Sequence, residues 1–456
     1  MEQLTELVTK ANSFIWGLYC LIPLLCGTGL YFTIKLRFVQ IRKFGLAFKY
    51  TFGNLTIFGK RADNDGMSSF QALATAIAAQ VGTGNLAGAA TAIALGGPGA
   101  IFWMWIAAFF GMATIFAEAV LAQTYKDKLP NGQVVGGPAY YISEGLHNKG
   151  LAVFFAVALI VALGFIGNMV QSNSIADAFN NAFGVNRLIV GICVAAAGGF
   201  VFFGGMGRIA SITEKIVPLM AAGYLLGGLY ILLTNAGQII PAFGMIIEGA
   251  FDPRAATGGI IGATMKEAIR YGVARGLFSN EAGMGSTPHA HAVAKVKNPA
   301  DQGFVAIMGV FVDTFLVLNM TAFVIFVTGA INTKLSGIAL TQAAFQTGLG
   351  SFGLPFVAVC MLFFAFSTII GWYFFGEQNI KFLFGVKGLT PYRVIVMLFV
   401  VLGSVLKLDL VWELADFFNG IMVFPNLVAL IGLSKVVSKA LENYDDQGRL
   451  KSDMVK

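Results

Sequence analysis

The stretch Ala78-Ala-Gln-Val-Gly-Thr-Gly-Asn85 lies in the middle of a long apolar segment and places two glycines and two side-chain amides there. A helix that crosses lipid must satisfy its own backbone hydrogen bonds, so a polar, glycine-rich interruption is tolerated only where it faces protein or a wet cavity. An interrupted helix also brings free N–H and C=O groups to one point, where they can hold an anion and a cation. The stretch therefore predicts a binding site built on a broken helix inside a membrane transporter.

The composition of the whole chain is that of a membrane protein. Its 456 residues are 57% hydrophobic and only 12% charged, and the mean hydropathy is +0.76, whereas soluble domains carry about 25% charged residues. Apolar runs long enough to span a bilayer recur from end to end. We therefore predict an all-α polytopic membrane protein with eleven transmembrane helices, near residues 13–34, 68–95, 98–125, 151–177, 187–205, 211–234, 258–284, 302–330, 354–384, 390–406 and 408–435.

The basic residues indicate the orientation of the chain. Most of the 30 lysines and arginines fall in the C-terminal tail and in loops on one side, Lys60 and Arg61 of the first loop among them. Because cytoplasmic loops carry the excess of positive charge, this side is predicted to be cytoplasmic, with the N-terminus outside and the C-terminus inside. The net charge of +7 is thus interpreted as loop bias, and we expect the lipid bilayer and no nucleic acid as a partner.

A second interruption, Arg275-Gly-Leu-Phe-Ser-Asn-Glu-Ala-Gly283, falls in the seventh predicted span. Each interrupted span opens a block of five, and because five is odd the two blocks have opposite orientations. Glycine-interrupted segments at corresponding positions of two inverted halves indicate a transporter site. We expect an extra first helix and a cytoplasmic loop in 1–66, repeats in 67–234 and 258–437, an extracellular connection in 235–257 and a cytoplasmic tail in 438–456.

Three segments between the spans carry further expectations. Residues 138–147 and 336–348 are predicted to form surface helices, which either pack on the bundle or act as gating elements. His289 and His291 follow Pro288 in a segment predicted to be a solvated cytoplasmic loop, and two histidines alone do not make a metal site.

The backbone around the first interruption suits an amino acid and a cation. The amides of Thr83, Gly84 and Asn85 begin the second half of the broken helix and could hold a carboxylate. The carbonyls of Ala78 and Val81 could hold an ammonium group or Na⁺, a hard cation that should prefer oxygen ligands. Residues 78–85 thus combine the hydrogen-bond donors that a carboxylate requires with the oxygen acceptors that a cation requires.

The ninth span offers two adjacent hydroxyls, Ser367 and Thr368, that could complete the cation site or only bond back to their own helix. Trp372 lies one turn beyond them and Phe278 lies in the second interruption, so these aromatics could make the cavity small and close it, or only pack the bundle. Asn168 and Gln171, three residues apart, share a helix face that could serve the ligand or a neighbouring helix.

Intramembrane acids are functional candidates by default. Among the acids of the predicted spans, we single out Glu118, Glu281, Asp313 and Glu377 as candidates. For Asp313 the sequence leaves two roles open: an ion pair with one of three arginines, or a part in a proton relay. The three arginines are Arg208, Arg270 and Arg275.

Four blocks of the chain resemble the signature blocks of the alanine or glycine:cation symporter family, within the amino acid–polyamine–organocation superfamily. The blocks are Gln80-Val-Gly-Thr-Gly-Asn-Leu-Ala-Gly-Ala-Ala-Thr-Ala-Ile93, Gly136-Gly-Pro-Ala-Tyr-Tyr-Ile142, Arg275-Gly-Leu-Phe-Ser-Asn-Glu-Ala-Gly-Met-Gly-Ser286 and Phe366-Ser-Thr-Ile-Ile-Gly-Trp-Tyr-Phe-Phe-Gly-Glu377. The resemblance implies a leucine-transporter-like 5+5 inverted repeat with one extra N-terminal helix. It also implies Na⁺-coupled uptake of alanine or glycine, by alternating access, in a prokaryotic plasma membrane.

The same resemblance assigns a site by matching positions. It implies a sodium site at Ala78, Val81, Ser367 and Thr368. It implies that the substrate lies against Thr75, Gln80, Thr83, Gly84, Phe278, Trp372 and Thr368, with Asn168 and Gln171 nearby.

The predicted function is sodium-coupled symport of small neutral amino acids (alanine, either enantiomer, and glycine), with no cofactor apart from the co-transported Na⁺. The alternatives are a proton-coupled symporter and a nontransporting amino-acid sensor. A channel would need a continuous polar pore. An enzyme is not expected, because the sequence shows no Ser/His/Asp or metal constellation.

Overall fold

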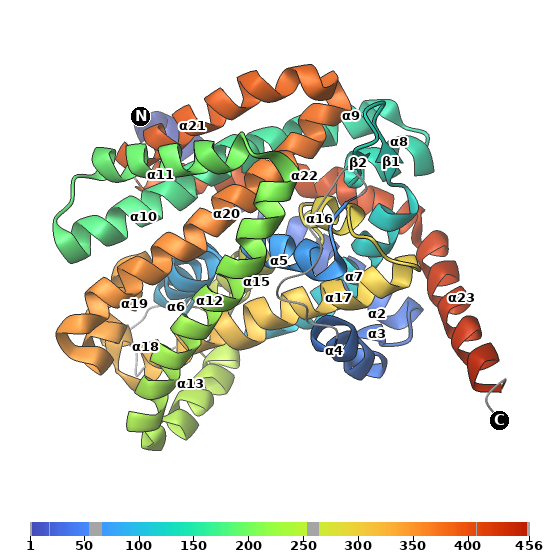
Figure 1. Cartoon of the computed structure of the whole chain (residues 1–456). Coiled ribbons are helices and arrows are strands. Elements are labelled where there is room, and N and C mark those ends of the chain that lie inside the picture. Colours follow the sequence, from blue (N-terminus) through green and yellow to red (C-terminus); the bar gives the residue numbers. More distant parts are fainter. Residues whose placement is uncertain (1, 18, 54–65, 253–263, 407, 454–456) are drawn as a thin grey trace.

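The computed structural model describes residues 2–17, 19–53, 66–252, 264–406 and 408–453, which form a bundle of helices (Figure 1). Lys60 and Arg61 of the first predicted loop lie outside these ranges, as do the ends of the predicted connection and tail and the start of the predicted seventh span. The sheet in the described ranges is one small hairpin of β1 (Asp127–Lys128) and β2 (Val134–Val135).

The helices follow most of the predicted spans. The first half of the chain contains α1 (Glu2–Ile15), α2 (Leu21–Lys35), α3 (Val39–Arg42), α4 (Phe44–Phe52), α5 (Ser69–Gln80), the π-helix η1 (Gly84–Gly88), α6 (Ala89–Gly96), α7 (Gly99–Thr124), α8 (Pro138–Gly145), α9 (Lys149–Leu159), the π-helix η2 (Ile160–Gly167), α10 (Asn168–Phe183), α11 (Arg187–Phe202) and α12 (Gly205–Thr234). The second half contains α13 (Ile239–Phe251), α15 (Met265–Asn280), α16 (Pro288–Ala292), α17 (Pro299–Val310), the π-helix η4 (Phe311–Leu318), α18 (Asn319–Val327), α19 (Gly337–Leu349), α20 (Gly353–Phe384), α21 (Leu389–Val405), α22 (Leu408–Gly432) and α23 (Ser434–Asp453).

Six helical stretches in the described ranges are long and apolar enough to cross a membrane: Gly99–Thr124, Lys149–Phe183, Gly205–Thr234, Pro299–Val327, Gly337–Val405 and Leu410–Gly432. Large apolar side chains face outward on these stretches, among them Leu219, Leu226 and Leu233 of α12. A soluble protein rarely exposes such continuous apolar surface, whereas a bilayer covers it. The structure thus confirms a helical membrane protein, while the number of eleven spans remains a prediction.

The predicted first span, residues 13–34, is wrong as a single helix. The chain leaves α1 at Ile15, passes Gly17 and begins α2 at Leu21. Pro23 lies in the first turn of α2, where the missing N–H is tolerated. Residue Asn12 bonds through Nδ2 to the backbone oxygen of Glu413 at 2.8 Å, which fastens α1 to α22. The polar contacts of α1 with α22, and not membrane-spanning length, therefore decide where this helix ends.

The first broken helix is short and tightly defined. Ser68 begins α5 through a capping box with Gln71. The helix ends at Gln80 because Val81 adopts an extended conformation (φ −84°, ψ 91°), and the chain resumes as η1 from Gly84. π-helical turns recur at functional sites. The interruption predicted from the glycines is therefore present, and it occupies the three residues between Gln80 and Gly84.

The second broken helix differs from the prediction in position. The helix α15 continues through Arg275 to Asn280, and the interruption covers residues 281–287. Three residues there have positive φ angles: Glu281, Gly283 and Gly285. Although Gly276, Ser279 and Asn280 are weak helix formers, the positive φ angles fall at Glu281, Gly283 and Gly285, so the break falls later.

The two histidines are not in a solvated loop, which corrects that expectation. His289 and His291 lie on α16, the short inner half of the second broken helix, and each is 1% exposed. Asn379 of α20 bonds His289 Nε2 at 2.8 Å, and Gln302 of α17 bonds His291 Nδ1 at 2.8 Å. Polar side chains satisfied by buried amides can lie in the interior, which the local sequence does not reveal.

Both predicted surface helices exist as α8 and α19. Thr341 of α19 donates to the carbonyl of Leu86 in η1 at 2.8 Å, so α19 packs directly on the first interruption. Tyr141 of α8 donates to Asn426 of α22, and both side chains are buried. The two helices are therefore parts of the bundle, and a gating role for either remains a prediction.

Candidate functional site

The predicted cation ligands of α5 and α20 meet at the first interruption. Thr368 Oγ1 lies 3.0 Å and Ser367 Oγ 3.3 Å from the carbonyl oxygen of Ala78. Each hydroxyl also lies within bonding distance of Phe364 O, so both bond back to their own helix while they contact Ala78, and their role as cation ligands remains a prediction. Val81 is buried and its N–H closes α5 by bonding Ile77 O at 2.7 Å. The two hydroxyls of α20 and the Ala78 carbonyl of α5 form a compact oxygen cluster. Hard cations prefer such oxygen ligands.

Gly82 allows the close approach of the broken helix to α20. A Cβ atom at this position would lie 2.2 Å from Thr368 Oγ1 and 3.1 Å from Thr368 Cβ. No side chain fits at such a distance, so the glycine is required by the contact and not only by backbone conformation. Gly84 has the same property toward α15, since its Cβ would lie 2.9 Å from the Cα of Ser279.

The backbone amides of the interruption are partly satisfied by the protein. The Thr83 amide donates to Gln171 Oε1 at 3.3 Å, and the Gly82 amide donates to Asn85 Oδ1 at 2.9 Å. The Asn85 amide bonds Gly82 O at 3.3 Å within the turn itself. Gln171 thus occupies the Thr83 amide, whereas the Asn85 amide bonds within the turn.

The two interruptions lie side by side although the sequence separates them widely. Gln80 Nε2 donates to the carbonyl of Asn280 at 2.7 Å. The carboxylate of Asp313, on η4, accepts hydrogen bonds from Asn85 Nδ2 at 2.7 Å and from Ser279 Oγ at 2.8 Å. Asp313 therefore links both broken helices, and a movement of one must affect the other.

The arginine partner considered for Asp313 is not found among the described residues. Its side-chain partners there are the neutral Asn85, Ser279 and Thr314. Arg275 is paired elsewhere, with Asp416 at 2.6 Å. Glu377 does have a basic partner, because Lys381 lies 2.6 Å away and both side chains are buried. Glu377 is thus part of an ion pair, while Asp313 is a buried acid held by neutral donors.

An aromatic wall closes the region beside the cation cluster. Phe278 and Trp372 meet edge to face, with ring centroids 5.8 Å apart and planes at 90°. Gly167 lies against the Trp372 ring, since a Cβ there would be 2.6 Å from the indole. Phe278 also packs on Trp412 of α22 at 5.0 Å. The rings of Phe278, Trp372 and Trp412 thus form one continuous aromatic wall.

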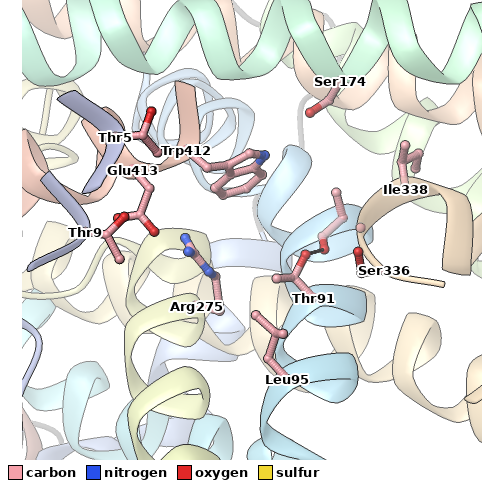
Figure 2. A pocket seen from close by; sticks show the side chains of 12 residues that line it. Thr5, Thr9, Thr91, Leu95, Ser174, Arg275, Ser336, Ile338, Trp412 and Glu413 are labelled. Carbon is pink, nitrogen blue, oxygen red and sulfur yellow. Dashed lines mark hydrogen bonds between the residues drawn. The ribbon is translucent and has the colours of Figure 1, made fainter. Parts of the chain in front are cut away.

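A pocket of about 320 Å³ lies beside Trp412, the ring on which Phe278 packs (Figure 2). It is lined by Thr5 and Thr9 of α1, Ala87 of η1, Thr91 and Leu95 of α6, Ser174 of α10, Arg275 of α15, Trp412 and Glu413 of α22, and Ser336, Gly337 and Ile338 at α19. Figure 2 shows the guanidinium of Arg275 directed toward Glu413 and Trp412. Arg275 lies 4.8 Å from the Trp412 ring, and its two bonds to Asp416 are 2.6 and 2.7 Å.

Asp416 was missed by the sequence reasoning, although it is an acid in the eleventh predicted span and the rule on intramembrane acids applies to it. With Arg275 and Trp412 it separates the pocket from Phe278. Arg275 and Asp416 form a bidentate ion pair, Arg275 lies over the Trp412 ring, and Trp412 packs at a tilt on Phe278.

On the other side of the wall, Glu118 of α7 holds the second interruption. Its carboxylate accepts from the amides of Gly283 at 3.0 Å and Gly285 at 2.9 Å. Asn426 Nδ2 bonds both Glu118, at 2.7 Å, and the carbonyl of Gly283, at 2.9 Å. Asn426 was not predicted, because a lone amide in an apolar span gives no signal of its partner.

Not every predicted ligand joins the cluster. The Thr75 hydroxyl lies 2.8 Å from Gln71 O and 3.0 Å from Thr213 Oγ1, which places it toward α12. Asn168 Nδ2 bonds back to Gly164 O at 3.0 Å. Within the described residues, three buried oxygen atoms of the predicted site lack a partner: Gln80 Oε1, Thr83 Oγ1 and Asn168 Oδ1. Buried polar atoms are normally satisfied, so these oxygens suit a polar ligand.

Comparison with known proteins identifies relatives over the whole length. The profile of the sodium:alanine symporter family matches residues 1–456. The chain is 45% identical over 449 residues to "Sodium/alanine symporter AgcS" of Methanococcus maripaludis, with 97% of each chain covered. It is 44% identical over 458 residues to "Probable sodium/glutamine symporter GlnT" of Bacillus subtilis, covering 100% of this chain and 94% of that protein.

Solved structures show the same fold at low identity. The crystal structure of MhsT in complex with L-phenylalanine matches with a TM-score of 0.58 and 13% identity, over 82% of this chain and 89% of that one. A manganese transporter of Eremococcus coleocola matches with a TM-score of 0.52 and 14% identity, over 78% and 75%. These neighbours have the leucine-transporter fold, which agrees with the predicted fold class. One fold thus carries an amino acid in one neighbour and a metal in another, so the substrate must be argued from the site.

Proposed function

Because this chain belongs to the sodium:alanine symporter family, we propose that it is a sodium-coupled symporter of small neutral amino acids, with alanine and glycine as substrates. Its relatives are transporters and not enzymes, as the sequence predicted, and secondary amino-acid transport follows from the family. The proposal of sodium coupling rests on the oxygen cluster of Ala78, Ser367 and Thr368. This cluster joins the end of α5 to α20.

The cation would hold the helices α5 and α20 together. Na⁺ at this cluster would lie between the carbonyl end of α5 and the hydroxyls of α20, with the Val81 carbonyl as a further ligand. The carbonyl end of a helix carries partial negative charge, which favours a cation there. Binding would therefore hold the broken helix against α20 and fix the shape of the adjoining substrate region.

The amino acid would occupy the region between the two interruptions. Its carboxylate would bond the Thr83 amide in place of Gln171, and its ammonium group would find unpartnered oxygens at Gln80 and Thr83. Phe278 and Trp372 would meet its side chain, and their close packing favours a methyl group or a hydrogen. The name of the Bacillus subtilis relative gives glutamine as its substrate. A side chain of that length would need these rings to separate.

Alternating access would use the closures on both sides of the site. On the side predicted to be external, opening requires Arg275 and Asp416 to separate. On the opposite side, it requires the linker held by Glu118 and Asn426 to move away from α7 and α22. The proposed location is a prokaryotic plasma membrane, with the N-terminus outside and the C-terminus in the cytoplasm.

Uptake of radiolabelled alanine into proteoliposomes tests the proposal. We expect a tenfold inward Na⁺ gradient to drive alanine accumulation up to about tenfold, the limit that one coupled ion sets without a membrane potential. A pH gradient without Na⁺ should drive none. Accumulation with the pH gradient alone would show that H⁺, and not Na⁺, is the coupling ion. Binding of alanine without accumulation under either gradient would favour a nontransporting amino-acid sensor.

A further inference from the structure

Glu281 occupies a backbone position that a glycine would normally fill. Three residues between α15 and α16 have left-handed backbone: Gly283 (φ 88°), Gly285 (φ 79°) and Glu281 (φ 58°). Left-handed conformation is unfavourable for residues with a Cβ, and it persists where the surroundings require it, often at functional sites. Positions 283 and 285 carry glycine, as expected, whereas position 281 carries glutamate. A glutamate at this position therefore indicates that its side chain is needed.

The carboxylate of Glu281 connects the aromatic wall to the inner half of the broken helix. One oxygen accepts the indole N–H of Trp372, and the other accepts the hydroxyl of Ser286 at 2.5 Å. Glu281 and Ser286 are fully buried, and Trp372 is 1% exposed. A buried indole N–H needs an acceptor, and the carboxyl group of Glu281 provides one. Glu281 therefore fixes the N–H edge of the indole.

The opposite side of the same ring is fixed by packing. Gly167 lies against the benzene part of the indole, and Phe278 meets it at 90°. Of these constraints, only the hydrogen bond to Glu281 sets the direction of the ring nitrogen. Without that bond the indole could turn about its side-chain torsions, and the space beside Phe278 would grow.

We propose that Glu281 is a positioning residue for substrate selection: it holds Trp372 in the orientation that limits the transported amino acid to a small side chain. The inference rests on the proposed function, in which Trp372 meets the substrate, and it adds a residue that does not itself meet the substrate. It applies to the size of the accepted side chain and not to the coupling ion.

The test compares kcat/KM for valine with kcat/KM for alanine in proteoliposomes. Trp372→Ala sets the upper limit of the relaxation. We expect Glu281→Ala to raise the valine-to-alanine ratio about tenfold, the effect of losing one buried hydrogen bond. Glu281→Gln keeps an acceptor oxygen and should stay within about threefold of the wild type. Ser286→Ala, the matched control, removes the other bond of the carboxylate and should leave the ratio unchanged.

A double-mutant cycle separates positioning from a general loss of packing. Trp372→Phe has no N–H to hold, so adding Glu281→Ala in that background should change the ratio less than about twofold. If Glu281→Ala does not fold, Glu281→Asp withdraws the carboxylate by one methylene and should raise the ratio by a few-fold. A wild-type ratio in Glu281→Ala or Glu281→Asp, or equal effects with and without the indole N–H, would overturn the inference. A wild-type protein that already prefers valine would instead overturn the proposed function.

Discussion

Replacing Thr368 with alanine should raise the Na⁺ concentration for half-maximal alanine uptake by about 10- to 100-fold. Thr368 Oγ1 lies 3.0 Å from the Ala78 carbonyl, and in the proposed site it is a direct oxygen ligand of the cation. A contact with a charged group contributes about 1.5–3 kcal/mol, which corresponds to this range. Uptake at saturating Na⁺ should recover, because the variant weakens the ion site without removing the substrate contacts. The measurement is uptake against Na⁺ concentration in proteoliposomes.

Two further variants give this prediction its specificity. Thr368→Ser keeps the hydroxyl and should stay close to the wild type. Thr347→Ala, on α19, removes a hydroxyl that bonds the carbonyl four residues earlier at 3.0 Å but is exposed and remote from α5. It should leave the Na⁺ dependence unchanged. Equal Na⁺ half-saturation in Thr368→Ala and the wild type would remove Thr368 from the ion site.

Gly82→Ala should reduce uptake by about 10- to 100-fold at any Na⁺ concentration. The added Cβ would lie 2.2 Å from Thr368 Oγ1, so α5 and α20 would have to move apart. Forcing an extra methyl group into a packed interior costs about 1–3 kcal/mol, and here the strain falls on the cation cluster itself. Initial uptake rates, normalised to the amount of folded protein in the liposomes, measure the effect.

The matched control is Gly223→Ala in α12. A Cβ at Gly223 meets nothing within 4 Å, and alanine is favoured over glycine within a helix by about 1 kcal/mol. This variant should transport normally and resist heat slightly better. If Gly82→Ala behaved like Gly223→Ala, the broken helix would not press against α20 in the transporting protein.

The sequence allowed the first interruption and its partners to be predicted because each carries a local signal. Glycines and amides in an apolar span mark a broken helix, and paired hydroxyls one turn before Trp372 mark the facing helix. The structure brings Ala78, Thr368 and Gly82 together as expected. Whether they bind Na⁺ remains a prediction.

The parts that the sequence did not reveal depend on long-range partners. Asp416 pairs with Arg275, and Asn379 bonds the buried His289. The local sequence around each of these residues does not indicate its partner. The second interruption was placed too early because Gly276, Ser279 and Asn280 have low helical propensity, yet they remain in α15. The break begins at Glu281, which takes left-handed backbone where its side chain reaches Trp372. Tertiary contacts override local propensity in such cases.

The central claim is that one broken helix binds both the ion and the amino acid, and thereby couples them. Thermodynamic linkage requires that the factor by which Na⁺ raises alanine affinity equals the factor by which alanine raises Na⁺ affinity. The most direct test is equilibrium binding to the purified protein, measured with each ligand in the absence and at saturation of the other. Our account predicts equal factors of at least about tenfold, and in Thr368→Ala the factors should stay equal while about 10- to 100-fold more Na⁺ is needed to reach saturation. An alanine Kd that does not change between zero and saturating Na⁺ would contradict it.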